Sequence, residues 1–152
     1  MVIYIYQCFL IRVSISSHIN HKKVTYDGVI IKCNLVTLEK EILVDRLNQP
    51  HSIYFSDDDL YFADFKRGVI AKYPYQEVVC TPSDTYPRGI AKKDNYLYIG
   101  ESVCRYHGDT HRKKNASVLI YDTDTGKMDR IELNCMNVYD ILILEYLLKL
   151  LF

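Results

Sequence analysis

The sequence has no tryptophan and no excess of charge of either sign. Lysine plus arginine and aspartate plus glutamate each number 19. The chain therefore carries no net electrostatic field that would attract nucleic acid or hold it against an acidic membrane. Neither partner is expected.

Paired cysteines and familiar catalytic signatures are also missing. The five cysteines are scattered, odd in number and never spaced as CxxC, so the sequence indicates neither a disulfide framework nor a zinc ribbon. A reducing cytoplasm is the expected compartment. We find no Ser-His-Asp order, no glycine loop that would cradle phosphate and no dinucleotide fingerprint.

The two apolar ends do not have the pattern of targeting or membrane segments. No basic residue precedes the N-terminal apolar run, whose first charge is Arg12, and no small-residue cleavage site follows it. The C-terminal run from Ile141 is too short to span a bilayer and contains Glu145 and Lys149. Alternating apolar residues predict one or two strands over residues 2–16.

Tyrosine is abundant, with 14 copies, and two segments 37 residues apart repeat one pattern. HSIYFSDDDLYFADF, from His51, aligns with RGIAKKDNYLYIGES, from Arg88. Each reads as a short strand, a tight turn rich in Asp and Asn, and an aromatic-rich strand. A meander that repeats at about 40 residues is the pattern of a β-propeller blade.

A second motif marks the third strand of each unit. DGVIIK, from Asp27, matches RGVIAK 40 residues later and, more loosely, ASVLIY a further 49 residues on. After each copy the chain turns and returns as another strand. We therefore predict an all-β fold, a partial β-propeller of about three four-stranded antiparallel blades within a single domain. The expected units are blade one at about 2–45, blade two at about 51–80, blade three at about 88–133 with an inserted loop at 103–116, and the start of a fourth at 139–147.

Three blades cannot close a ring, because closed propellers have at least four. The chain is then a fragment of a longer gene product, or identical chains complete a ring head to tail, or the blades form an open array. Open blade edges would also permit self-association.

The motif order resembles the six-bladed β-propeller superfamily of the NHL and gluconolactonase type. It is most similar to an uncharacterised bacterial propeller family found near or fused to sugar- and methyl-transferases. The likeness rests on HSIYFSDDDLYFADF, YPRGIAKKDNYLYIGES and NVYDIL, and covers about residues 27–142. It implies a channel lined by inner strands, but that family supplies no established reaction. The family's ring also needs blades on both sides of those present here.

The first residues of the blades are the candidate ligand-binding residues. Innermost strands face the channel of a propeller, and blade openings gather at one mouth. The aligned positions are His51, Arg88, and Tyr139 or Asp140. A histidine, an arginine and an acid on one axis would hold an anionic or hydroxylated small ligand. Alternatively, they pair with one another and seal the channel.

Two carboxylates support an alternative, metal-dependent interpretation. Asp64 and Glu101 occupy matching positions at the end of the second strand. Calcium-dependent lactonases of similar shape hold a cation through carboxylates near the channel. With His51 and Arg88, these acids would make a hydrolase site for Ca or Zn, unless both are solvated strand ends. The acids at 57–59 are assigned to a hairpin turn instead.

The inserted loop carries a weak zinc pattern. Cys104, His107 and His111 have a ligand-like spacing, but a fourth ligand is missing and the basic run 112–114 opposes a cation. A polar surface loop is favoured, and no cofactor is predicted.

The sequence thus predicts a non-catalytic binding module for a small polar or saccharide ligand, or for a protein partner. The alternatives are a metal-dependent hydrolase or lactonase, and a truncated product without independent function.

Overall fold

The computed structural model describes residues 3–6, 9–14, 28–56, 59–74, 76–80, 85–103 and 115–144. Within these ranges the chain is all-β, as predicted, and no helix there is long and apolar enough to cross a bilayer. The elements are β1 (Ile3–Tyr6), β2 (Phe9–Ser14), β3 (Gly28–Asn34), β4 (Lys40–Leu47), β5 (Pro50–Ser56), β6 (Asp59–Asp64), the 3₁₀ turn η1 (Phe65–Arg67), β7 (Val69–Lys72), β8 (Gln76–Cys80), β9 (Thr85–Lys93), β10 (Tyr96–Val103), β11 (Ser117–Asp122) and β12 (Met128–Glu132).

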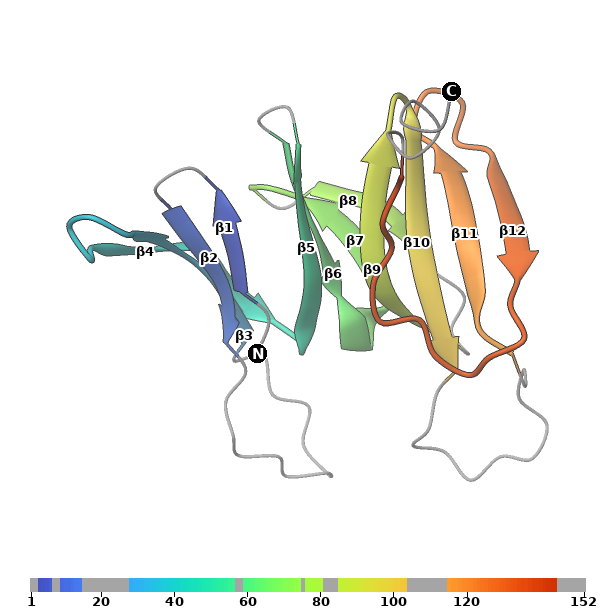
Figure 1. Cartoon of the computed structure of the whole chain (residues 1–152), viewed down its shortest axis with the longest axis horizontal. Helices are drawn as coiled ribbons and strands as arrows, with labels where there is room; N and C mark the ends of the chain where they lie inside the picture. Colours follow the sequence, from blue (N-terminus) through green and yellow to red (C-terminus); the bar gives the residue numbers. More distant parts are fainter. Residues whose placement is uncertain are drawn as a thin grey trace, which may run out of the picture.

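The strands form three antiparallel sheets, each built from one consecutive stretch of chain. We call them the first sheet (β1–β4), the second sheet (β5–β8) and the third sheet (β9–β12). Every sheet is a simple meander, because each strand pairs with its neighbours in sequence. The sheets follow one another across the molecule in chain order (Figure 1).

Short turns set the register of the two repeated hairpins. Ser56 pairs with Asp59, so only Asp57 and Asp58 separate β5 from β6, and these two residues lie outside the described ranges. Lys93 pairs with Tyr96 in the corresponding β9–β10 hairpin. There the chain turns through Asp94, whose φ of 52° is left-handed and suits an Asp or Asn residue.

The second sheet is buried on both faces, which explains why the four central residues of β6, Leu60 to Ala63, are apolar or aromatic without a polar residue between them. Leu60 and Phe62 pack into a cluster with Ile30 of the first sheet. Tyr61 and Ala63, which alternate with them, pack into a separate cluster with Ile99 of the third sheet. Successive strand residues point to opposite faces, so one strand contributes to two cores. Burying each large apolar side chain stabilises the fold by roughly 1.5–3 kcal/mol.

The third sheet buries one face against the second and leaves the other largely open. Leu97, Ile99 and Leu119 face the second sheet. We call the opposite side of this sheet the outward face. Tyr98 pairs with Ile120, Gly100 with Val118, and Val118 with Ile131, and residues that pair across strands lie on the same side of a sheet. The outward face is therefore made up of Tyr98, Gly100, Val118, Ile120 and Ile131. Ile131 is 52% exposed and the others on this face are only half-buried, apart from Gly100.

The strand pairing corrects the alignment of the third repeated strand. Ala63 pairs with Ile70 in the second sheet, whereas Gly100, which matches Ala63, pairs with Val118 in the third sheet. Ile70 therefore corresponds to Val118, one residue away from the predicted match. The looser sequence match was wrong because a run of apolar residues can be aligned in either of two registers that differ by one residue. The correct register becomes clear only from the pairing with the neighbouring strand.

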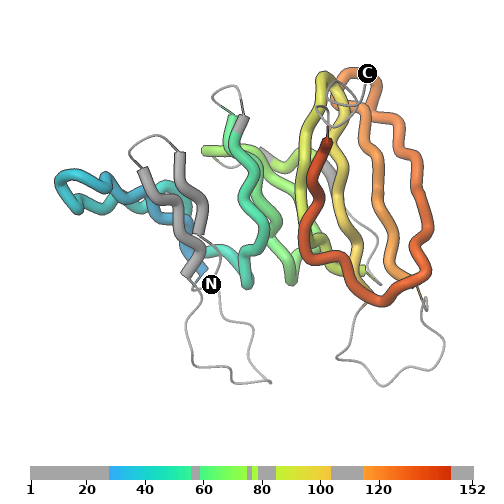
Figure 2. The backbone as a smooth tube through the Cα atoms, in the orientation of Figure 1, coloured from blue at the N-terminus to red at the C-terminus, as the bar shows by residue number. Residues whose placement is uncertain are grey.

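A fourth strand was predicted to open at Tyr139, but residues 139–144 form no strand, and residues 145–147 lie outside the described ranges. Residues 133–144, which we call the C-terminal strap, cross the third sheet and then run alongside β9 (Figure 2). A strand needs a ladder partner, and none follows the strap in the described part of the chain.

The C-terminal strap is nevertheless docked firmly on the outward face. The Val138 backbone N–H donates to Ser102 Oγ at 3.0 Å, and Ser102 Oγ donates to the Val138 carbonyl at 2.8 Å. A Cβ at Gly100 would lie 2.4 Å from Val138 Cγ1, and one at Gly89 would lie 2.8 Å from the Cα of Asp140. Two glycines therefore make room for the strap.

Candidate functional site

A repeated backbone bulge positions the predicted site residues. Ser52 in β5 and Gly89 in β9 have φ values of 51° and 74°, and they stand 37 residues apart at the same place in the repeat. The pairing register shifts beside both of them. A bulge re-aims the side chains next to it, here those of His51 and Arg88. The Gly89 N–H donates to Ser52 Oγ at 2.7 Å and thereby joins the two bulges.

Phe65, the first residue of η1, lies at the centre of the site. Its ring meets the His51 ring edge-on at 4.9 Å and stacks on Tyr86 at 4.3 Å. The Arg88 guanidinium carbon is 5.0 Å from the Phe65 centroid and 5.5 Å from the Tyr139 centroid. Aromatic faces attract a guanidinium, so two rings hold Arg88 in place.

His51 is held in its neutral form. Burial, followed by the positive charge of Arg88, lowers the pKa of His51 from 6.5 to about 4. Both causes penalise the imidazolium. Near neutral pH the site therefore carries the charge of Arg88 beside an uncharged imidazole.

One hydrogen-bond donor of the Arg88 side chain has no acceptor among the described residues. Its Nε is buried, and within the described residues it finds no acceptor. A buried donor without an acceptor costs about 1–3 kcal/mol. Such a donor in a folded protein calls for an explanation, and a bound acceptor supplies one.

The structure brings together three of the four residues predicted to line a channel mouth. His51, Arg88 and Tyr139 all surround or extend from Phe65. Asp140 does not complete the group as an acid: the described contacts of Arg88 are with the rings of Phe65 and Tyr139, and the Asp140 carboxylate accepts a hydrogen bond from the Ile141 N–H at 2.9 Å. Its backbone instead covers Gly89.

Sequence reasoning missed Phe65 and Tyr86, the two rings on which this group is built. An alignment of the repeats picks out residue types that occur at the same position in both copies. Phe65 aligns with Ser102 and Tyr86 with Gln49, so neither aromatic residue has a counterpart in the other copy. The available signal was the aromatic residue directly before Pro87 and the basic pair that follows Phe65, and neither is specific.

Asp64 is fully buried at the end of β6, so the expectation of a solvated strand end is wrong. Its Oδ1 accepts the Asn48 backbone N–H at 2.9 Å, and its Oδ2 lies 3.7 Å from the Arg67 guanidinium. Arg67 follows three residues later, in η1, which bends the chain back over the carboxylate.

Glu101, the matching acid in β10, is also fully buried. Its oxygens accept hydrogen bonds from the hydroxyls of Thr85 at 3.1 Å and Ser117 at 2.7 Å. The guanidinium of Arg130 approaches with Nε at 2.9 Å and a terminal nitrogen at 3.1 Å. A buried carboxylate requires such compensation.

The two carboxylates proposed as metal ligands thus form structural ion pairs, Asp64 in the second sheet and Glu101 in the third. In the described part of the chain no group of three or more His, Cys, Asp and Glu side chains is arranged to hold a metal ion. The zinc pattern at Cys104, His107 and His111 lies outside the described residues. The basic run 112–114 lies outside them as well.

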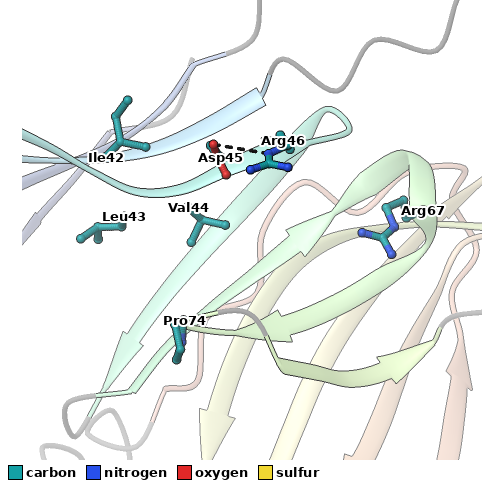
Figure 3. Close-up of a pocket in the computed structure, with 7 residues that line it drawn as sticks. All are labelled: Ile42, Leu43, Val44, Asp45, Arg46, Arg67 and Pro74. Carbon is teal, nitrogen blue, oxygen red and sulfur yellow. Dashed lines mark ion pairs between the residues drawn. The ribbon is translucent and has the colours of Figure 1, made fainter.

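An open groove of about 630 Å³ lies elsewhere, between the first and second sheets (Figure 3). Ile42, Leu43 and Val44 of β4 give it an apolar wall, with Pro74 across from them. Its arginines are already engaged: Arg46 lies 3.6 Å from Asp45, and Arg67 pairs with Asp64 and with Glu77 at 3.1 Å. The groove is therefore not the site at which His51 and Arg88 meet.

Neither a scan against protein-family models nor a search of curated protein sequences finds a match to this chain.

Proposed function

We propose that the three sheets are successive blades of a β-propeller of the NHL and gluconolactonase type. Three observations support this proposal. The sheets are sequential four-stranded meanders, and the second packs its two faces against its neighbours. The inner strands β5 and β9 share a bulge at the same repeat position. The C-terminal strap follows them in the place that the next inner strand would take.

We further propose that the chain is a non-catalytic module that binds a small polar ligand where the inner strands meet. The observation that carries this proposal is the state of Arg88. Its guanidinium is fixed by the rings of Phe65 and Tyr139, and its Nε is buried without an acceptor among the described residues. Preorganised, unsatisfied donors are what a polar ligand site offers.

The metal-dependent hydrolase is not proposed, because no observation favours it. Asp64 and Glu101, the acids that it required, are held by Arg67 and Arg130. Both carboxylates are fully buried and already compensated, so a cation would have to displace these partners to bind either of them.

Binding of small compounds by the purified chain tests the proposal. Thermal-shift screening of a panel of monosaccharides, sugar acids and hydroxy acids should yield at least one ligand, whose Kd calorimetry then measures. Replacing Arg88 by Ala should weaken that ligand by tenfold or more. Arg46→Ala, which removes an exposed arginine paired with Asp45, is the matched control and should leave the Kd unchanged. Equal weakening by both replacements would contradict the proposal.

A further inference from the structure

Arg88 differs from Arg46, Arg67 and Arg130 in the groups that compensate its positive charge. Arg46, Arg67 and Arg130 each lie within 4 Å of a carboxylate. Among the described contacts, Arg88 has rings in place of a carboxylate. Aromatic rings orient a guanidinium, but they are poor hydrogen-bond acceptors for its N–H groups. The positive charge and the N–H donors of Arg88 therefore remain available to a ligand.

Among the residues that the structure describes, no carboxylate forms an ion pair with Arg88. His51 is neutral at pH 7, because its pKa is lowered to about 4. One carboxylate oxygen of Asp140 accepts a hydrogen bond from the Ile141 N–H. The contacts that the structure shows for Arg88 thus leave its positive charge without a carboxylate partner among the described residues.

We propose that the ligand of this site carries a carboxylate, which Arg88 binds between the rings of Phe65 and Tyr139. This inference rests on the proposed function and specifies the class of its ligand. A carboxylate is flat, matches the guanidinium fork and brings one negative charge to one fixed positive charge. A dianionic phosphate needs more donors than Arg88 and a neutral imidazole offer.

Tyr139 is the side chain that admits the ligand. Because Arg88 Nε is buried, a ligand oxygen reaches it only when a neighbouring group moves aside. Tyr139 is 66% exposed, so its ring can turn toward solvent while Val138 and Asp140 keep the C-terminal strap docked. Phe65, in contrast, is buried and stacked, so it acts as the fixed wall.

The test compares ligands that differ only in the carboxylate. Glucuronate is measured against glucose, and lactate against propane-1,2-diol, with acetate and sulfate as simple anions, all by calorimetry and ligand-observed NMR. The carboxylate member of at least one pair should bind at least tenfold more tightly than its neutral partner. Arg88→Gln should bring that ratio close to one, while Arg88→Lys, which keeps the charge but loses the fork, should keep only part of it. Arg46→Gln should leave it unchanged.

The outcomes separate this inference from the proposed function. If the neutral members bind as tightly as the acids, the carboxylate inference is wrong and the proposed function stands. If sulfate competes as well as the acids do, the site recognises charge alone, and the inference is also wrong. If no compound of either pair or of the wider panel binds, both are wrong. The paired ligands are compared on the unaltered protein, so these outcomes do not depend on the folding of the Arg88 variants.

Discussion

His51 should make the folded chain lose stability when the pH falls below neutrality. Its imidazole is half-buried against Phe65 and close to Arg88, and these neighbours lower its pKa from 6.5 to about 4. The folded protein therefore prefers neutral His51, whereas the unfolded chain takes up a proton near pH 6.5. Acidification should favour unfolding through this one residue.

The sign and size of the effect follow from the two pKa values. Above pH 6.5 both states hold a neutral imidazole, so the full stability is present. Between pH 6.5 and about 4 the unfolded chain binds a proton that the folded chain does not, and the free energy of unfolding decreases. At about 1.4 kcal/mol per pKa unit, the total loss by pH 4 is at most about 3 kcal/mol.

The assay is urea unfolding at pH 7.0 and pH 4.5, on the natural chain and on His51→Gln. Carboxylates titrate in both proteins and cancel in the comparison, so the natural chain should lose about 2 to 3 kcal/mol more than the variant. NMR titration of the imidazole gives the pKa directly, and Arg88→Gln should raise it part of the way toward 6.5. A folded-state imidazole that titrates near 6.5 would refute the description of this site.

Three further predictions concern the framework. Glu101→Gln should lower the free energy of unfolding by about 2–4 kcal/mol in urea, because the amide keeps only one of the two acceptor oxygens and removes the negative charge that Arg130 pairs with. Adding Arg130→Met should restore part of this loss, and a loss below about 0.5 kcal/mol would contradict the prediction. Gly100→Ala should cost about 1–3 kcal/mol and speed hydrogen exchange of the Val138 amide, because the added Cβ would collide with the Arg88 carbonyl and the Val138 side chain. Gly126→Ala has open space for its Cβ; although its φ of 71° makes the alanine cost about 1 kcal/mol, it should leave the local exchange of the Val138 amide unchanged. The natural chain should self-associate through the outward face as its concentration rises. Ile131→Lys should reduce the association measured by light scattering without lowering stability, because Ile131 is exposed on that face. Unchanged association would exclude the outward face as the contact surface.

The strands and the meeting of His51 with Arg88 could be predicted because both depend on recurrence. Alternating apolar residues fix which strand face is buried, and two matching positions in adjacent repeats lie side by side when the repeats stack. The strand at residues 28–34 and the two aromatic hairpins were visible for this reason. The all-β class followed from them.

Features that depend on a single contact could not be predicted. The burial of Asp64 depends on η1, a turn without a counterpart at the matching position of β10, where the chain continues to Val103. The partner of Glu101 is Arg130, 29 residues away on another strand. Phe65 becomes the centre of the site only through the same turn. Nothing in the spacing of such residues separates them from ordinary surface positions.

The hydrogen bond between Gly89 and Ser52 joins two adjacent sheets through their first strands. β9 supplies the N–H, and β5 supplies the hydroxyl that accepts it. Asp140 in turn lies against Gly89, so the segment after the third sheet contacts the first strand of that sheet. Contacts of this kind link each element to its nearest neighbour, and they make the stability of the second sheet, the third sheet and the C-terminal strap interdependent.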